Sequence, residues 1–361
     1  MNTISFEQRA NRAVSNWIFL GVIMLLVQVV LGGVTRLTGS GLSITEWEVV
    51  TGSLPPLNEQ QWLAEFNKYQ QTPQYRLLNT GFTLSDFKFI FFWEWFHRLW
   101  ARLIAVAFVV GFVYLIAKKY LKKEMVNPLL ILFLLGALQG AIGWIMVASG
   151  LKGDAVYVRP TKLAMHFVFA LGLISYAFWL ALQIKIPSQK RINLPGLYRW
   201  SWVLIVILFV QLIFGALMAG HKAATVAPTW PTINGSWVPD GLLQEEPVTL
   251  NFFENKVTIH FVHRGLAYTL LILIIIYSVK LFRIRPASSI FSQARRMPLL
   301  LVTVQVILGI LSVLTSTGII PNRWGTFEWM AQLHQIIGML LVLSLVAMLF
   351  LTRASSFKQP S

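Results

Sequence analysis

The chain has 361 residues, of which 56% are hydrophobic and 12% are charged, with a formal net charge of +16 and no cysteine. A soluble domain usually carries about 25% charged residues, so the composition excludes an ordinary soluble protein and indicates an integral membrane protein. The lack of cysteine excludes disulfides, cysteine-ligated zinc, iron–sulfur clusters and thiolate-ligated haem.

Eight segments are long and apolar enough to cross a bilayer as helices, because a spanning helix needs about 20 mostly apolar residues. They cover residues 17–35, 89–117, 128–149, 163–184, 200–220, 257–279, 298–316 and 329–351. The segments are apolar on every face, whereas strands of an outer-membrane barrel alternate apolar and polar residues. The sequence therefore predicts an all-α membrane protein with eight transmembrane helices, the first retained rather than cleaved.

The positive charge follows a topological pattern. Lys and Arg collect in the cytoplasmic loops of membrane proteins. Here they gather before the first segment and after each even-numbered one, as in Lys118, Lys119, Lys122 and Lys123, while most carboxylates lie in the other loops. We therefore predict a multi-pass protein of the bacterial cytoplasmic (inner) membrane, with both termini in the cytoplasm and no nucleic-acid partner.

A motif repeats along the chain: each odd-numbered segment contains one Gln-x-x-x-Gly, and each even-numbered segment has one histidine near its start. The glutamines are Gln28, Gln139, Gln211 and Gln305, and the histidines are His97, His166, His263 and His334. Three of the four matched positions recur after 166 or 168 residues, and Gln28 recurs after 183 because the first outside loop is longer. The offsets predict a parallel duplication that gives two tandem four-helix bundles, 1–190 and 191–361.

The glutamines and glycines of this motif have two interpretations. Small residues let membrane helices approach closely, and a buried amide can hydrogen-bond across to a neighbouring helix. The glycines would equally let a flat cofactor approach the backbone.

The outside loop before the second segment, roughly 36–88, is long enough to have a function or to be disordered. Its aromatic residues, among them Trp62, Phe66, Tyr69 and Tyr75, predict ordered structure. They would act either as interfacial anchors or as part of a lid over a site at the outer end of the bundle.

All four histidines lie toward the outer end, since even-numbered helices enter the membrane from outside. An isolated histidine in a spanning segment is uncommon and needs a partner. Two histidines from facing helices can ligate one haem iron on both axial faces, as bundle cores do for cofactors. The repeat pairs His97 with His166 and His263 with His334, which predicts a haem site in each bundle.

Three arginines accompany the histidines. Arg98 and Arg264 directly follow the first histidine of each pair, and Arg102 lies one turn beyond Arg98. Guanidinium groups can hold haem propionates through charged hydrogen bonds, which makes the three candidate propionate contacts. The alternative is that they snorkel to the membrane interface.

The two halves differ beside the first histidine of each pair. Glu94 precedes His97 by three residues, where His260 precedes His263, and residues three apart share a helix face. A carboxylate at this depth is costly unless it is used, so we expect one half to react and the other to store or pass electrons. Glu94-x-x-His97 also matches half of a di-iron motif, but segments three to eight carry no embedded carboxylate to complete it.

Several unlinked stretches occur together in order: Gly32-Gly-Val-Thr-Arg-Leu-Thr-Gly-Ser-Gly-Leu-Ser, Pro55-Pro-Leu-Asn, Glu94-x-x-His97-Arg98 and His263-Arg264-Gly-x-Ala-Tyr268, with His166 and His334 in place. This set resembles the haem A synthase family, in the branch that lacks paired cysteines in the outside loops. The resemblance extends from about Asn16 to Leu351. A mechanism that relies on paired cysteines is not expected here.

The resemblance implies an oxidoreductase that oxidises a methyl group of haem O to a formyl group, giving haem A for cytochrome oxidase. It implies that Glu94 is the catalytic carboxylate, that His97 and His166 bind the substrate haem, and that His263 and His334 ligate a haem b that relays electrons. The implied partners are haem O synthase as donor of haem O, an electron donor and cytochrome oxidase assembly, and a homo-oligomer is compatible with it.

Two rivals make different predictions. A bis-His cytochrome b that carries electrons without modifying haem would hold two equivalent haems permanently. A transporter built from parallel repeats would use the histidines for protons or substrate and bind no haem.

Overall fold

The computed structural model describes residues 5–46, 51–286, 288–320 and 323–354. Within these ranges, eight helical spans are long and apolar enough to cross a membrane, which confirms the predicted all-α membrane fold. They are α1 (Phe6–Leu37), α4 (Leu84–Ala117), α5 (Lys123–Ala148), α6 (Pro160–Lys185), α7 (Pro195–Gly220), α8 (Lys256–Phe282), α9 (Ser289–Ala294) with α10 (Met297–Leu314), and α11 (Thr326–Thr352).

Most of these helices begin before the predicted segments. Ser5 forms a capping box with Gln8 at the start of α1, and Thr83 forms one with Asp86 at the start of α4. Such caps satisfy the first backbone N–H groups of a helix outside the apolar layer. Apolarity alone therefore located the middle of each helix, and the polar caps set the ends.

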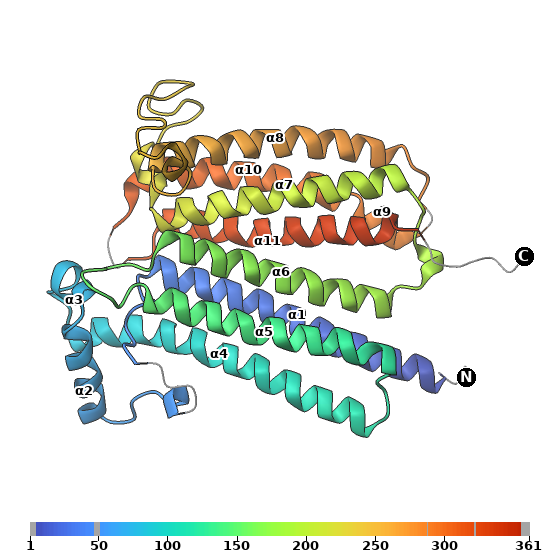
Figure 1. The fold of residues 1–361 in the computed structure, drawn as a ribbon, viewed down its shortest axis with the longest axis horizontal. Coiled ribbons are helices and arrows are strands. Elements are labelled where there is room, and N and C mark those ends of the chain that lie inside the picture. Colours follow the sequence, from blue (N-terminus) through green and yellow to red (C-terminus); the bar gives the residue numbers. More distant parts are fainter. Residues whose placement is uncertain (1–4, 47–50, 287, 321–322, 355–361) are drawn as a thin grey trace, which may run out of the picture.

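The helices form two groups side by side (Figure 1). In the N-terminal half, α1 packs against α4 and α6, and α5 packs against α6. In the C-terminal half, α7 packs against α8 and α11, and α10 packs against the same two helices. The halves meet where α6 contacts α7 and α11, and where α1 contacts α11.

Both chain ends lie at one end of the molecule, which we call the terminus end, and the longest connections lie at the opposite loop end (Figure 1). The basic connection between α4 and α5 is at the terminus end, together with that between α6 and α7. This arrangement places the Lys- and Arg-rich segments on one side, as the charge pattern predicts.

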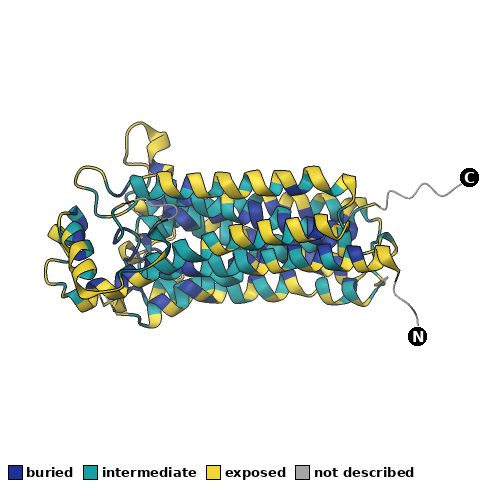
Figure 2. Cartoon of the chain, turned by 90° about the horizontal axis from the view of Figure 1, so that it is seen from below, coloured by how far each residue is buried: buried dark blue, intermediate teal, exposed yellow. Residues whose placement is uncertain are grey.

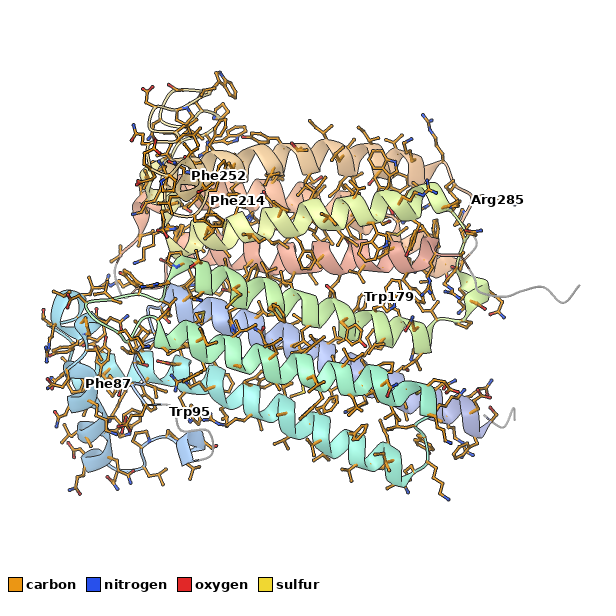
Figure 3. The ribbon with its side chains drawn as sticks, viewed as in Figure 1. Phe87, Trp95, Trp179, Phe214, Phe252 and Arg285 are labelled. Atoms are coloured by element: carbon orange, nitrogen blue, oxygen red, sulfur yellow. The ribbon has the colours of Figure 1, made fainter. Side chains whose placement is uncertain are left out.

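Burial is uneven among the spans. In the most apolar window of α11, 67% of residues are buried, against 6% in each of α4 and α5. Phe350 of α11 contacts Trp179 of α6 with ring centres 5.3 Å apart, inside the interface between the halves (Figure 3). The outer surfaces of the helices carry exposed residues along their length (Figure 2), and apolar ones such as Val109 and Val113 suit contact with lipid.

The long segment before α4 is partly helical rather than a continuous loop. It contains α2 (Glu59–Gln70) and α3 (Pro73–Leu78), and Asn58 caps α2. Their aromatic side chains pack on Phe87 near the start of α4 (Figure 3), with ring centres of Tyr69 and Phe87 5.3 Å apart. The aromatic residues therefore order this segment at the loop end.

The remaining connections contain short 3₁₀ turns. These are η1 (Thr51–Ser53), η2 (Ser188–Lys190), η3 (Ala223–Val226), η4 (Val248–Phe252) and η5 (Ser316–Gly318). The described residues contain no strand, only an isolated antiparallel bridge between Ile233 and Ser236.

Candidate functional site

The four histidines line one continuous cavity of about 1230 Å³. His97 lies on α4, His166 on α6, His263 on α8 and His334 on α11, each in the part of its helix toward the loop end. Pockets for a single drug-sized ligand usually measure about 300–1,000 Å³. The cavity therefore exceeds what one small ligand needs, and residues of both halves line it.

The structure brings together the histidines of the C-terminal half. The ring centres of His263 and His334 are 6.4 Å apart, with the ring planes at 74°. Two imidazole nitrogens that each lie about 2 Å from one metal ion place their ring centres roughly 6 Å apart. The spacing fits two axial ligands on one iron. In the N-terminal half, His97 and His166 line the same cavity and lie close enough to interact electrostatically.

Each glutamine of the repeated motif contacts one of these histidines. The amide nitrogen of Gln28 is 3.2 Å from Nε2 of His97, and that of Gln139 is 3.1 Å from Nδ1 of His166. Gln211 and Gln305 approach Nε2 of His263 and His334 at 3.5 and 3.3 Å, in that order. The predicted hydrogen bond from a buried amide to a neighbouring helix is therefore made to the imidazole itself.

Each glycine of the motif lies against the same imidazole. A Cβ added at Gly32 would be 3.1 Å from Cε1 of His97, and one at Gly143 would be 2.8 Å from Cε1 of His166. Gly215 and Gly309 stand in the same relation to His263 and His334, at 3.1 and 3.0 Å. The missing side chains leave room for the rings, so glycine–imidazole contact is the reason for glycine at these positions.

These residues fit a haem held by two imidazoles. The side-chain oxygens of the four glutamines, Gln28, Gln139, Gln211 and Gln305, are buried without a hydrogen-bond partner. An imidazole that ligates iron through one nitrogen carries a proton on the other and needs an acceptor for it. A glutamine amide rotated end for end would supply one, since its two terminal atoms are exchangeable in assignment. Nδ1 of His334 already lies 3.0 Å from the carbonyl oxygen of Gln305, which can accept its proton. For Nε2 to bind iron, the side-chain amide of Gln305, now 3.3 Å away, would have to turn aside.

A di-iron centre has less support. Among the described residues, no group of three or more His, Cys, Asp and Glu side chains lies close enough to hold a metal ion. Haem needs only two protein ligands on its iron, and the histidine pairs meet that requirement.

Glu94 is buried in the cavity wall, with 2% of its surface exposed, and both of its oxygens accept hydrogen bonds. Oε2 accepts from the backbone N–H and the hydroxyl of Ser43, each at 2.7 Å, and from the N–H of Ile44 at 2.9 Å. Oε1 accepts from Arg98 at 2.6 Å. The carboxylate therefore ties the segment after α1 to α4, in addition to facing the cavity.

His260 occupies the corresponding place in the C-terminal half. It is 1% exposed, and its Nε2 accepts a hydrogen bond from Nε of Arg264 at 3.0 Å. The Glu94–Arg98 and His260–Arg264 contacts are both between residues four apart on one helix. The halves thus share the geometry and differ in the charge of the group.

Arg98 and Arg264 also hold the connections at the loop end. Arg98 donates to the carbonyl oxygens of Ile44 and Glu46, each at 3.2 Å. Arg264 donates to Thr229 at 2.6 Å, to Thr232 at 3.1 Å and to Ala227 at 3.3 Å. All three candidate propionate contacts, Arg98, Arg102 and Arg264, line the cavity. Contact with a propionate stays a prediction for them.

One residue of the site was missed by sequence reasoning. Arg36 is four residues after Gly32 and eight after Gln28, and residues spaced by four share a helix face. It lines the cavity, and Glu328 of α11 is the charged group that interacts with it. Within the described part of the chain, its guanidinium makes no hydrogen bond or ion pair. The spacing Gln28, Gly32, Arg36 was the available signal.

A row of amide contacts joins the two sites, and it was also missed. On either side of His334, Gln332 and Gln335 donate to the carbonyl oxygens of Val30 and Val29 of α1, at 3.2 and 2.8 Å. Gly33 makes room for both glutamine side chains. The contacts link the helix that carries Gln28 to the helix that carries His334.

Comparison with known proteins agrees with this geometry. The COX15-CtaA family model, described as cytochrome oxidase assembly protein, matches residues 15–346. The chain belongs to this family. Members similar to it include proteins named "Heme A synthase" from Bartonella quintana (39% identical, covering 86% of each chain) and Bradyrhizobium diazoefficiens (41% identical, covering 88% of each). A third, from Parvibaculum lavamentivorans, is 41% identical over 76% of this chain and 79% of its own. The family match covers all four histidines of the site.

Proposed function

We propose that this protein is a haem A synthase, an enzyme of haem A biosynthesis that oxidises a methyl group of haem O to a formyl group. The observation that carries the proposal is the single cavity with two histidine pairs, each imidazole held by one glutamine and one glycine. Membership of the cytochrome oxidase assembly family over nearly the whole chain supports it, as do the names of the similar proteins.

We assign different haems to the two pairs. His97 and His166 would bind the substrate haem O, and His263 and His334 would ligate a haem b cofactor. The difference between the buried carboxylate of Glu94 and the imidazole of His260 supports this division, because chemistry at a ring substituent needs a charged group that simple electron transfer does not. When bound, haem b would supply one-electron redox chemistry.

Glu94 is the proposed catalytic carboxylate. It accepts hydrogen bonds from Ser43, Ile44 and Arg98, and these bonds hold the carboxylate in one position in the cavity wall. We therefore propose that Glu94 stabilises positive charge that develops near the methyl group during oxidation, and we favour this role over proton transfer. A charge held in a fixed position in a water-poor site is suited to that role.

The arginines of the cavity wall suit the propionates of the bound haems. Arg98, Arg102 and Arg264 remain candidates, and we add Arg36. It lies on the face of α1 that holds His97, while the matching position of α7, four residues after Gly215, is Ala219. A guanidinium is a strong donor to carboxylates.

We further propose the setting in which the enzyme works. The two halves arose by parallel duplication, and the protein lies in the bacterial cytoplasmic membrane with its basic terminus end in the cytoplasm. Haem O synthase would provide the substrate, a separate donor the electrons, and cytochrome oxidase assembly would receive the product.

Extraction of haem from the purified full-length protein tests the proposal. The absorption spectrum and mass of the extract should show haem b together with haem O or haem A. Two equivalents of haem b alone would support the cytochrome b alternative. The observation that favours this alternative is that the two histidine pairs have similar contacts with glutamine and glycine. No haem after expression in haem-replete cells would contradict both and favour the transporter.

Glu94→Gln separates the role of the carboxylate from the fold. Gln keeps the size of the side chain but loses the charge, and its amide nitrogen cannot accept the hydrogen bonds that one carboxylate oxygen now accepts. We expect haem A formation to fall by at least about 100-fold while haem b stays bound. Retained conversion would remove Glu94 from the chemistry.

A further inference from the structure

The cavity reaches deeper toward the terminus end in the N-terminal half than in the C-terminal half. On α1 its lining extends to Trp17, eleven residues before Gln28, whereas on α7 it ends at Leu208, three residues before Gln211. The same holds for the other matched helices, α4 with α8, α5 with α10 and α6 with α11. In each pair, the lining of the N-terminal helix extends four residues further from its histidine or glutamine than the lining of the C-terminal helix. At 1.5 Å per residue, the extra depth is about 6 to 12 Å.

The side chains at matched positions explain the difference. Counted from the paired glutamines and histidines, the N-terminal half has small residues where the C-terminal half has large ones. The pairs are Gly21 and Leu204, Ala105 and Leu271, Gly136 and Val302, Gly140 and Val306, and Ala177 and Leu345. Leu204, Val302 and Leu345 are almost fully buried. The C-terminal half is therefore filled with side chains where the N-terminal half is hollow.

The hollow also opens sideways. In the C-terminal half α8 packs against α10, but within the described residues α4 and α5, which hold the matching places, approach each other less closely. A Cβ at Gly21, Gly136 or Gly140 would meet no atom within 4 Å, and the two glycines of α5 are exposed. Space therefore lies between α4 and α5, and α4 is on the side of the N-terminal half that faces away from the other half (Figure 1).

Aromatic rings bound this space at depth. Trp17 and Phe108, the deepest lining residues of α1 and α4, contact each other with ring centres 5.1 Å apart. Phe133 of α5 stacks on Phe108 at 5.9 Å. The space thus has a floor, and it runs from the His97–His166 pair along apolar side chains. We call it the N-terminal channel, lined by Gly21, Ala105, Phe108, Gly136, Gly140 and Ala177.

We propose that the N-terminal channel holds the long isoprenoid chain of haem O and thereby selects haem O for the N-terminal site. The proposal rests on the proposed function. Haem O differs from haem b by this chain, which replaces one small vinyl group on the ring. The channel is continuous with the histidine pair, apolar, closed at depth and open to the lipid from which a prenylated haem would come. The C-terminal site lacks such space and takes the haem without the chain.

The selection acts through shape. Lipid tails are as apolar as the channel, so burial of the chain in protein gains little from the hydrophobic effect. An empty, preformed space instead fixes the chain and hence the rotation of the ring about the iron axis, which would bring one methyl group to Glu94. Filling the space should exclude haem O and leave a haem without the chain unaffected.

The test transplants side chains from the C-terminal half into the channel, as the triple variant Gly21→Leu, Gly136→Val, Gly140→Val. Purified full-length variant and wild type are titrated with haem O and, separately, with haem b, and binding is followed by absorbance. We expect the affinity for haem O to fall at least tenfold and that for haem b to stay within about twofold. Gly172→Val is the matched control, because a Cβ at Gly172 also meets no atom within 4 Å and Gly172 does not line the cavity.

The outcomes separate the two ideas. Unchanged haem O binding by the filled variant would overturn the channel and leave the synthase assignment intact. Equal losses of haem O and of haem b that is added after the C-terminal site is filled would also overturn it, since the substitutions would then act on the ring site. If the wild type takes no haem O at all, the proposed function fails. Haem b retained in the C-terminal half shows that the triple variant is folded. Gly140→Val alone fills less of the channel and serves as a second variant.

Discussion

At the scale of single residues, each imidazole is set by two contacts from the neighbouring odd-numbered helix. The glutamine fixes the rotation of the ring, and the glycine leaves the space into which the ring fits. Both are short-range steric and hydrogen-bonding effects, so conservative changes should have large consequences. Gly143→Ala tests the glycine contact, and Arg36→Gln tests a separate contact in the same half.

Gly143→Ala should displace His166. The added methyl would lie 2.8 Å from Cε1 of the imidazole, too close without movement, and overpacking of this kind costs about 1–3 kcal/mol. We expect the substrate haem to be lost from the N-terminal half while the haem b spectrum persists. Gly172→Ala, which meets no atom within 4 Å, should change neither, and a normal haem O spectrum in Gly143→Ala would disprove the role of the glycine.

Arg36→Gln should weaken binding in the N-terminal half alone. A hydrogen bond to a charged group contributes about 1.5–3 kcal/mol, so we expect the Kd of haem O to rise about 10- to 150-fold. Binding of haem b in the C-terminal half, measured in the same titration, serves as the control because α7 has Ala219 at the matching position. Arg36→Lys should recover part of the affinity, and an unchanged Kd would exclude the guanidinium from the site.

At the scale of elements, the segment between α1 and α4 is a small folded cap. Phe66, Tyr69 and Phe87 form a buried cluster, and the hydroxyl of Tyr69 donates to Gln74 and accepts from Asn79. Gln74 in turn donates to the carbonyl of Gly39. The cap is thereby fastened to the end of α1, beside the Ser43–Glu94 contact.

The cap should open at alkaline pH. Burial raises the pKa of Tyr69 from 10.0 to about 12. Because the folded-state pKa lies above the unfolded value, the stabilisation is complete below about pH 10 and is lost as the pH rises through about 12. The difference in tyrosinate absorbance between wild type and Tyr69→Phe should show one group that titrates near pH 12, together with new proteolysis of 59–78. Titration near pH 10 would mean that the hydroxyl is not buried.

At the scale of the whole molecule, the contact between α1 and α11 joins the two sites. Gln332 and Gln335 bind the backbone of α1, whereas the matching positions of the α6–α7 contact are the apolar Ala164, Phe167 and Ala216. The polar contact runs between Gln28, which holds His97, and His334. A shift there should therefore reach both pairs.

Gly33→Ala should disturb both halves together. Its methyl would overlap Gln332 and approach Gln335 at 2.8 Å, so the two glutamine side chains must leave their bonds to α1 or the helices must move apart, at about 1–3 kcal/mol. We expect a lower Tm and altered spectra of both haems. Gly265→Ala on α8, with no atom within 4 Å, is the control. A change confined to one haem would show that the contact does not couple the sites.

The sequence by itself determined the eight spans and the family, and it singled out the four histidines and Glu94. Long apolar segments form helices in lipid, because every backbone polar group must find its hydrogen-bond partner within the segment. The histidines stood out because polar groups there are rare. Even so, the polar ends of the helices and the short helices α2 and α3 escaped a search for apolar length, since they depend on caps and on aromatic packing.

Only the tertiary structure decided which faces of these helices meet. Segments that are apolar all round carry little information about their partners, because lipid and protein are equally apolar surroundings. The bond from Gln335 to Val29 joins residues 306 positions apart, and Arg264 reaches carbonyls more than 30 residues earlier. The N-terminal channel likewise exists only because small side chains from four helices face one space, which no single stretch of sequence reveals.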